Sequence, residues 1–175
     1  MARYFPRHTQ EWKHEESPAF QRLTRSLVEM AILTGVAVRL FDAVAKPRGA
    51  SAGWVYHGSV FAIGMIILLG AATLHLGNYT LRNWAWRAPA FGAIAALAEC
   101  LTIAALIAVG REPLGAGRAT WGDWPALAFN AIFWRTIVVT VYALVLGGAV
   151  KLVRSVLTRS GTPVTEDTPV STETV

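Results

Sequence analysis

Residues Gly49 to Leu81, GASAGWVYHGSVFAIGMIILLGAATLHLGNYTL, contain no Asp, Glu, Lys or Arg. A helix of about 20 apolar residues crosses the roughly 30 Å hydrocarbon layer of a bilayer, and this stretch is longer than that. Three further apolar segments flank it, at about 24–45, 88–110 and 124–150. Together with a span at about 54–77, they predict an integral membrane protein that crosses the bilayer four times.

The composition also favours a membrane protein over a soluble one. Hydrophobic residues make up 54% of the 175 and charged residues only 15%, against about a quarter charged in soluble domains. The loops are too short to fold separately, so we expect one transmembrane domain, 18–160, between an N-terminal arm, 1–17, and a disordered tail, 161–175. The net charge of +5 fits the basic flanks of membrane helices, and no nucleic-acid partner is expected.

The short connectors predict that consecutive helices pack antiparallel, which gives an all-α, up-down bundle of four transmembrane helices. The first helix is expected to start at Pro18, with Ser17 as its cap, and to run unbroken to about Ala45. Lys and Arg are in excess on the side that holds both ends of the chain. By the positive-inside rule, both termini are cytoplasmic, in a plasma membrane or bacterial inner membrane.

Two charged residues fall near the centres of predicted spans, Glu99 in the third and Arg135 in the fourth. Because charge at the bilayer centre is costly, both side chains should face protein or water, and the simplest arrangement is an ion pair between them. Such a pair can be structural, fixing which helices pack together. Contact with a partner subunit and a proton or ion pathway are the alternatives.

The side of the third span that carries Glu99 is rich in small residues. Small side chains let membrane helices approach closely, so this side is a predicted helix-packing face. Its members are Gly92, Ala95, Ala96 and Thr102. The other charges of the first span, Glu29, Arg39 and Asp42, are interpreted as interfacial anchors, with Arg39 and Asp42 pairing at one surface.

His57 and His75 lie near opposite ends of the second span, and a histidine on a membrane helix can ligate a haem iron or a chlorophyll-type pigment. A bis-histidine haem needs a second imidazole at the same depth, and only the arm histidines His8 and His14 remain, so only His75 could be matched. A chlorophyll-type pigment needs only one histidine, so it stays more open than a haem, and no cofactor is assigned from this pattern alone. The G-x-S-x-G pattern at 49–53 lies in a predicted loop and is read as a turn rather than as a hydrolase nucleophile.

Tryptophans gather at the predicted span ends, where the amphipathic indole ring anchors helices at the membrane surface. These predicted anchors are Trp54, Trp84, Trp86, Trp121 and Trp124.

The sequence therefore favours a noncatalytic membrane subunit that packs against other integral membrane subunits and membrane lipids. The second hypothesis is a small oligomeric transporter or channel that uses Glu99. The third is a haem- or pigment-binding membrane protein or a membrane enzyme.

Overall fold

A computed structural model of the chain describes residues 18–48, 53–115 and 117–160, which are helical apart from loops and one short hairpin. The expected arm, 1–17, and tail, 161–175, lie outside these residues. In chain order the elements are α1 (Pro18–Arg25), α2 (Leu27–Arg48), α3 (Trp54–Leu76), α4 (Leu81–Ala108), β1 (Pro113–Leu114), β2 (Gly117–Arg118) and α5 (Trp124–Ser160).

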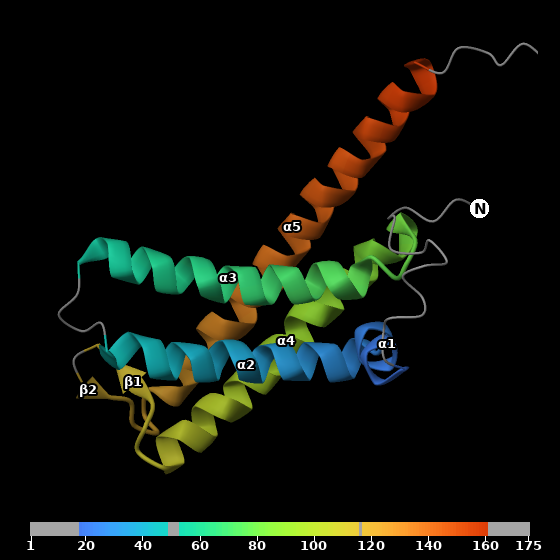
Figure 1. Cartoon of the computed structure of the whole chain (residues 1–175). Helices are drawn as coiled ribbons and strands as arrows, with labels where there is room; N and C mark the ends of the chain where they lie inside the picture. The colour runs from blue at the N-terminus through green and yellow to red at the C-terminus, as the bar shows by residue number, and fades with distance from the viewer. Residues whose placement is uncertain (1–17, 49–52, 116, 161–175) are drawn as a thin grey trace, which may run out of the picture.

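The first helical segment is divided at Ser26 instead of running unbroken from Pro18. The Ser26 hydroxyl accepts a hydrogen bond from the backbone N–H of Glu29 at 3.2 Å, so it caps the start of α2. Figure 1 shows α1 turned away from the axis of α2. A serine that can cap a new helix therefore ends α1 and redirects the chain.

The helix α4 begins at Leu81, before the predicted third span at 88–110, so residues 81–87 are helical instead of forming a connector. Thr80 has an extended backbone and marks the start, while Pro89 lies inside the helix. Trp84 and Ala88 are buried on these first turns. Pro89 cannot donate the helical hydrogen bond to the residue one turn earlier.

Three helices are long and apolar enough to cross a membrane: α3, α4 and the part of α5 from Trp124 to Val153. The helix α2, which contains most of the expected first span, does not belong to this set. It carries Glu29, Arg39 and Asp42 within 18 residues, and its charge density sets it apart from the other three.

The helices form two antiparallel pairs that cross each other, α2 with α3 and α4 with α5 (Figure 1). The helix α4 is central, because it packs along both α2 and α5, whereas its chain neighbour α3 touches it at few points. Fully buried side chains fill the space between them: Val38, Leu68, Leu76, Phe91, Ile103 and Val139. The sequential contacts expected for an up-down bundle thus hold within each pair but not between α3 and α4.

An antiparallel hairpin with two residues in each strand follows α4. Pro113 lies opposite Arg118, and Leu114 lies opposite Gly117. It contacts α2 and holds Glu112, the residue before β1, in a fully buried position. The loop after α4 therefore closes over the end of the helix bundle.

Candidate functional site

Glu99 of α4 and Arg135 of α5 lie in direct contact. Arg135 Nε donates to Glu99 Oε2 at 2.8 Å, and Arg135 Nη2 donates to Glu99 Oε1 at 3.3 Å. Glu99 is buried and Arg135 is partly buried. This two-pronged geometry is the strongest arrangement for an arginine and a carboxylate, and it joins the two helices that pack most extensively.

A second arginine, Arg39 of α2, also reaches Glu99, with Arg39 Nη1 3.8 Å from Glu99 Oε1. Arg39 also forms an ion pair with Glu112, and its Nε donates to Glu112 Oε2 at 3.2 Å. Both Arg39 and Glu112 are buried. The four side chains form a row of alternating charge, Glu112, Arg39, Glu99 and Arg135, which we call the charge row.

Arg39 is therefore not an interfacial anchor paired with Asp42. Asp42 instead accepts a hydrogen bond from Lys46, one turn further along α2, at 2.8 Å. The sequence contained a signal for this pairing, because residues four apart on a helix can form an ion pair. An ion pair between Asp42 and Lys46 leaves Arg39 free to pair with another acidic residue. Glu112 carried no such signal, since its position depends on how the hairpin folds back over α2.

The charge row contains two acids and two bases, so its formal charges cancel. Each inner member touches two opposite charges, and a buried charge without a partner would be strongly unfavourable. To carry an ion or a proton, Glu99 would have to leave both Arg39 and Arg135. The geometry instead suits a clamp that joins α2, α4, the loop after α4 and α5.

The small-residue face around Glu99 is divided between two neighbouring helices of the same chain. A Cβ at Gly92 would lie 2.9 Å from Thr136 Cα, so this position faces α5. Ala95 faces Gly35 of α2. Ala96 is fully buried, and the Thr102 hydroxyl donates to the carbonyl of Ala98 within α4.

His75 is fully buried, and both ring nitrogens have partners within the chain. Nδ1 lies 3.0 Å from the carbonyl oxygen of Thr24, which requires it to donate, and Nε2 then accepts from Arg87 Nη1 at 3.2 Å. In this conformation neither nitrogen is free for a haem iron or a pigment. His57 is exposed beside Tyr56, with ring centroids 6.0 Å apart.

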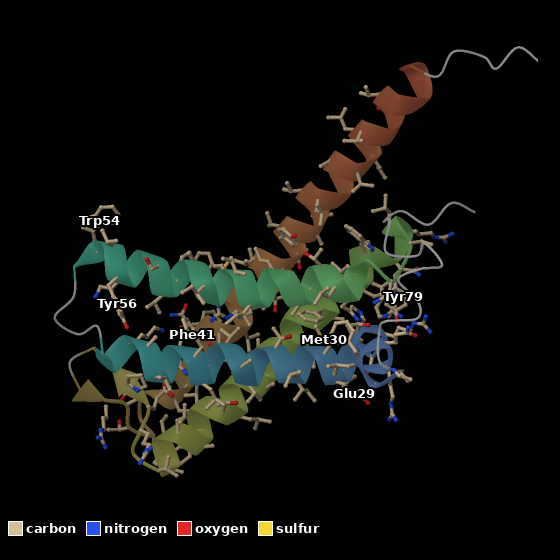
Figure 2. The ribbon with its side chains drawn as sticks, in the orientation of Figure 1. Glu29, Met30, Phe41, Trp54, Tyr56 and Tyr79 are labelled. Atoms are coloured by element: carbon tan, nitrogen blue, oxygen red, sulfur yellow. The ribbon has the colours of Figure 1, made fainter. Side chains whose placement is uncertain are left out.

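The hydrogen bond between His75 and the Thr24 carbonyl is one of three that attach α1 to the end of α3. Asn78 Nδ2 also donates to the Thr24 carbonyl, at 3.3 Å, and the Tyr79 hydroxyl donates to the Arg25 carbonyl at 2.6 Å. Figure 2 shows Tyr79 beside α1. The break at Ser26 interrupts the helical ladder there, and three side chains from one short segment satisfy the carbonyls next to it.

The tryptophans expected as membrane anchors divide into two groups. Trp54, Trp86 and Trp121 are exposed, and Figure 2 shows Trp54 pointing away from the helices at the start of α3. Trp84 is buried instead, and its Nε1 donates to the carbonyls of Leu76 and Tyr79. The Trp124 Nε1 donates to the Cys100 carbonyl at 3.2 Å and links the start of α5 to α4.

Among the described residues, no group of three or more His, Cys, Asp or Glu side chains is placed to hold a metal ion. Residues 49–52 of the G-x-S-x-G pattern lie outside that part of the chain. Comparisons with protein families, with curated proteins and with solved structures found no match for this chain.

Proposed function

We propose that the chain is a noncatalytic subunit of a larger membrane protein complex, in a plasma membrane or bacterial inner membrane, with four spans and both termini in the cytoplasm. In this proposal α2 is the remaining span. Its 22 residues correspond to about 33 Å, enough to cross the hydrocarbon layer. Its central charge, Arg39, is buried against Glu99 and Glu112, and charged side chains inside membranes are tolerated when they are paired in this way.

The observation that carries the subunit role is the C-terminal end of α5. Gly147 lies beside Trp84 and Leu81, so the remainder of α5, 148–160, runs past the first residue of α4 (Figure 1). This extension is about 20 Å long. In this proposal Arg82 and Trp86 lie at the membrane surface, so the extension begins at that surface and projects away from the bilayer.

The apolar part of α5, Trp124–Val153, is about 45 Å long and exceeds the roughly 30 Å hydrocarbon layer, so in this proposal the extension carries apolar side chains beyond that layer. Leu152 and Val153 are 65% and 56% exposed, and the polar residues Lys151 and Ser155 lie on other sides of the same helical turns. Outside the bilayer this part of α5 would be surrounded by water. An exposed apolar stripe on a helix in water is typical of a protein interface. A neighbouring subunit that covers this stripe accounts for the length of α5.

The test is native mass spectrometry of the full chain extracted gently from its own membrane. We expect the wild-type chain to be released with other protein chains in fixed stoichiometry. The double variant Leu152→Ser/Val153→Ser should be released without them, while Ser155→Ala, on the same extension, should keep them. Equal thermal unfolding of the three proteins would show that the fold is unchanged.

Two results would contradict the proposal. Release of the wild-type chain alone would remove the subunit role. Release as a symmetric oligomer of this chain would favour the transporter hypothesis, and ion flux through vesicles containing Glu99→Gln would then be the next measurement.

A further inference from the structure

A groove of about 350 Å³ lies between the first turns of α4 and the second half of α5. Its walls are mainly apolar and come from Leu81, Trp84 and Ala88 on one side and from Ala143, Leu144 and Gly147 on the other. Gly147 and Gly148 keep it open, because neither adds a side chain to the wall. This groove takes no part in the charge row.

The polarity of the groove changes along its length. Ala88 and Thr140 mark its deep end, and the Thr140 hydroxyl is already bonded to the Thr136 carbonyl. Arg82 and Lys151 line the outer end, one from each helix. Both are exposed, and neither forms an ion pair with an acidic residue in the described part of the chain.

This arrangement matches an amphiphile that has an anionic head. The two cations line the outer end of the groove, at the level that the proposed function assigns to the membrane surface, and the apolar walls run inward from them. Phosphate groups at a membrane surface attract Lys and Arg, and basic pockets between membrane helices bind anionic lipid heads. We propose that this groove holds one anionic phospholipid, with its phosphate on Arg82 and Lys151 and an acyl chain along Trp84 and Leu144.

This inference rests on the membrane location in the proposed function, but not on the subunit role. The two can fail separately. If alkaline carbonate washing releases the chain from membranes, the membrane location fails. If the chain stays in the membrane but binds no anionic lipid, only the lipid site fails.

The experiment uses the full chain in mild detergent, mixed with equal amounts of phosphatidylglycerol and phosphatidylcholine that carry the same acyl chains. Native mass spectrometry then counts the retained lipid. We expect one phosphatidylglycerol per chain, preferred over phosphatidylcholine on the order of 30-fold for two cations near the phosphate. In Arg82→Gln/Lys151→Gln the preference should vanish, while Arg82→Lys/Lys151→Arg should keep it.

Two matched controls separate charge and shape from general damage. Arg111→Gln removes an exposed cation beyond the other end of α4 and should leave the preference unchanged. Gly148→Leu should fill the groove and lower retention of both lipids, whereas Gly70→Leu on α3 should not. A Cβ at either glycine meets no atom within 4 Å, so both variants should fold.

Three results would overturn the proposal. Equal retention of the two lipids by the wild-type chain would remove the phosphate site. An unchanged preference in Arg82→Gln/Lys151→Gln would place the lipid elsewhere. Displacement of the lipid by inorganic phosphate at a comparable concentration would show a site for a free anion instead of a phospholipid.

Discussion

Gly35 of α2 lies directly against the backbone of Ala95 in α4. A Cβ added at Gly35 would overlap the Ala95 carbonyl oxygen and would lie 3.0 Å from Ala98 Cβ. The overlapping atoms belong to a helix backbone, which cannot rotate away as a side chain can. The absence of a side chain at Gly35 therefore sets how closely α2 and α4 approach, and with it the reach of Arg39 to Glu99.

The first prediction concerns this contact. Gly35→Ala should lower the free energy of unfolding by about 1–3 kcal/mol, the usual cost of forcing a methyl group into a packed contact. Thermal unfolding followed by circular dichroism in detergent measures it. Gly58→Ala on α3 is the control, because a Cβ there meets open space and alanine favours helix by up to about 1 kcal/mol. Equal stability of the two variants would contradict the close approach of α2 and α4.

The second prediction concerns how much stability the protein loses when single members of the charge row are replaced. Glu99→Leu should be worse than Arg135→Leu, since Glu99 contacts two arginines, whereas Glu99 still keeps Arg39 when Arg135 is removed. Breaking a buried pair from one side costs about 3–5 kcal/mol. The test is to measure the free energy of unfolding of both single variants and of the double variant Glu99→Leu/Arg135→Leu.

The double variant should recover much of the loss, because it leaves Arg39 and Glu112 as a balanced pair. Damage in the double variant equal to the sum of the two single losses would mean that the two side chains do not stabilise each other.

The third prediction concerns the buried pair between α2 and the loop after α4. Arg39→Met leaves Glu112 buried without its partner, so it should destabilise the protein and loosen the hairpin. Adding Glu112→Gln should restore part of the stability, because it removes the uncompensated charge. Hydrogen exchange at 113–118 is the measurement. The same exchange rates in wild type and Arg39→Met would show that the pair does not hold the hairpin.

The fourth prediction concerns the attachment of α1. Tyr79→Phe removes the hydrogen bond to the Arg25 carbonyl and keeps the ring. It should cost about 0.5–1.5 kcal/mol and expose α1. Trypsin cleavage after Arg22 and Arg25 should become faster, while cleavage after Arg118 stays constant. Tyr56→Phe, which loses a similar bond to the Ala45 carbonyl, controls for a general effect of losing a hydroxyl.

The fifth prediction concerns Asp123, in the loop before α5. The backbone N–H and the hydroxyl of Thr120 both donate to its carboxylate at 2.8 Å, and these bonds hold the pKa of Asp123 below its usual value. A lowered pKa in the folded state means that the stabilisation is complete above the ordinary Asp pKa of about 3.9. It is lost as the pH falls through the lower folded value.

The pKa of Asp123 can be followed by NMR of protein labelled with carbon-13 at the aspartate carboxyl groups. In Thr120→Val the Asp123 titration midpoint should rise towards the ordinary value, and it should stay partly lowered because the backbone donor remains. A midpoint identical to that of wild type would mean that the hydroxyl bond is absent in solution.

The helical class and three helices that are long and apolar enough to cross a membrane could be predicted from the sequence, because hydropathy and length are local properties of a segment. The contact between Glu99 and Arg135 followed from equal depth on neighbouring helices. The break at Ser26 was harder to predict from the sequence. A serine that caps a new helix and a serine inside a continuous helix look the same in a sequence, and only the hydrogen-bond partners of the nearby carbonyls distinguish them.

The rest of the charge row could not be predicted from local pattern. Arg39 and Glu112 meet only because α4 packs along α2 rather than along α3, and that choice depends on how closely Gly35 and Ala95 approach. For the same reason, Trp84 was predicted to lie at the surface but is buried under the turn between α3 and α4.

The distance along the chain between Arg39 and its buried partner has a consequence for synthesis. Glu112 follows Arg39 by 73 residues, which a ribosome needs roughly 4–15 s to translate. If α2 is a membrane span, as proposed above, its Arg39 lacks the Glu112 partner during that interval, and burial of this charge in a bilayer is then more costly than in the finished protein. In this proposal α2, although made early, is therefore among the last helices to reach its final position.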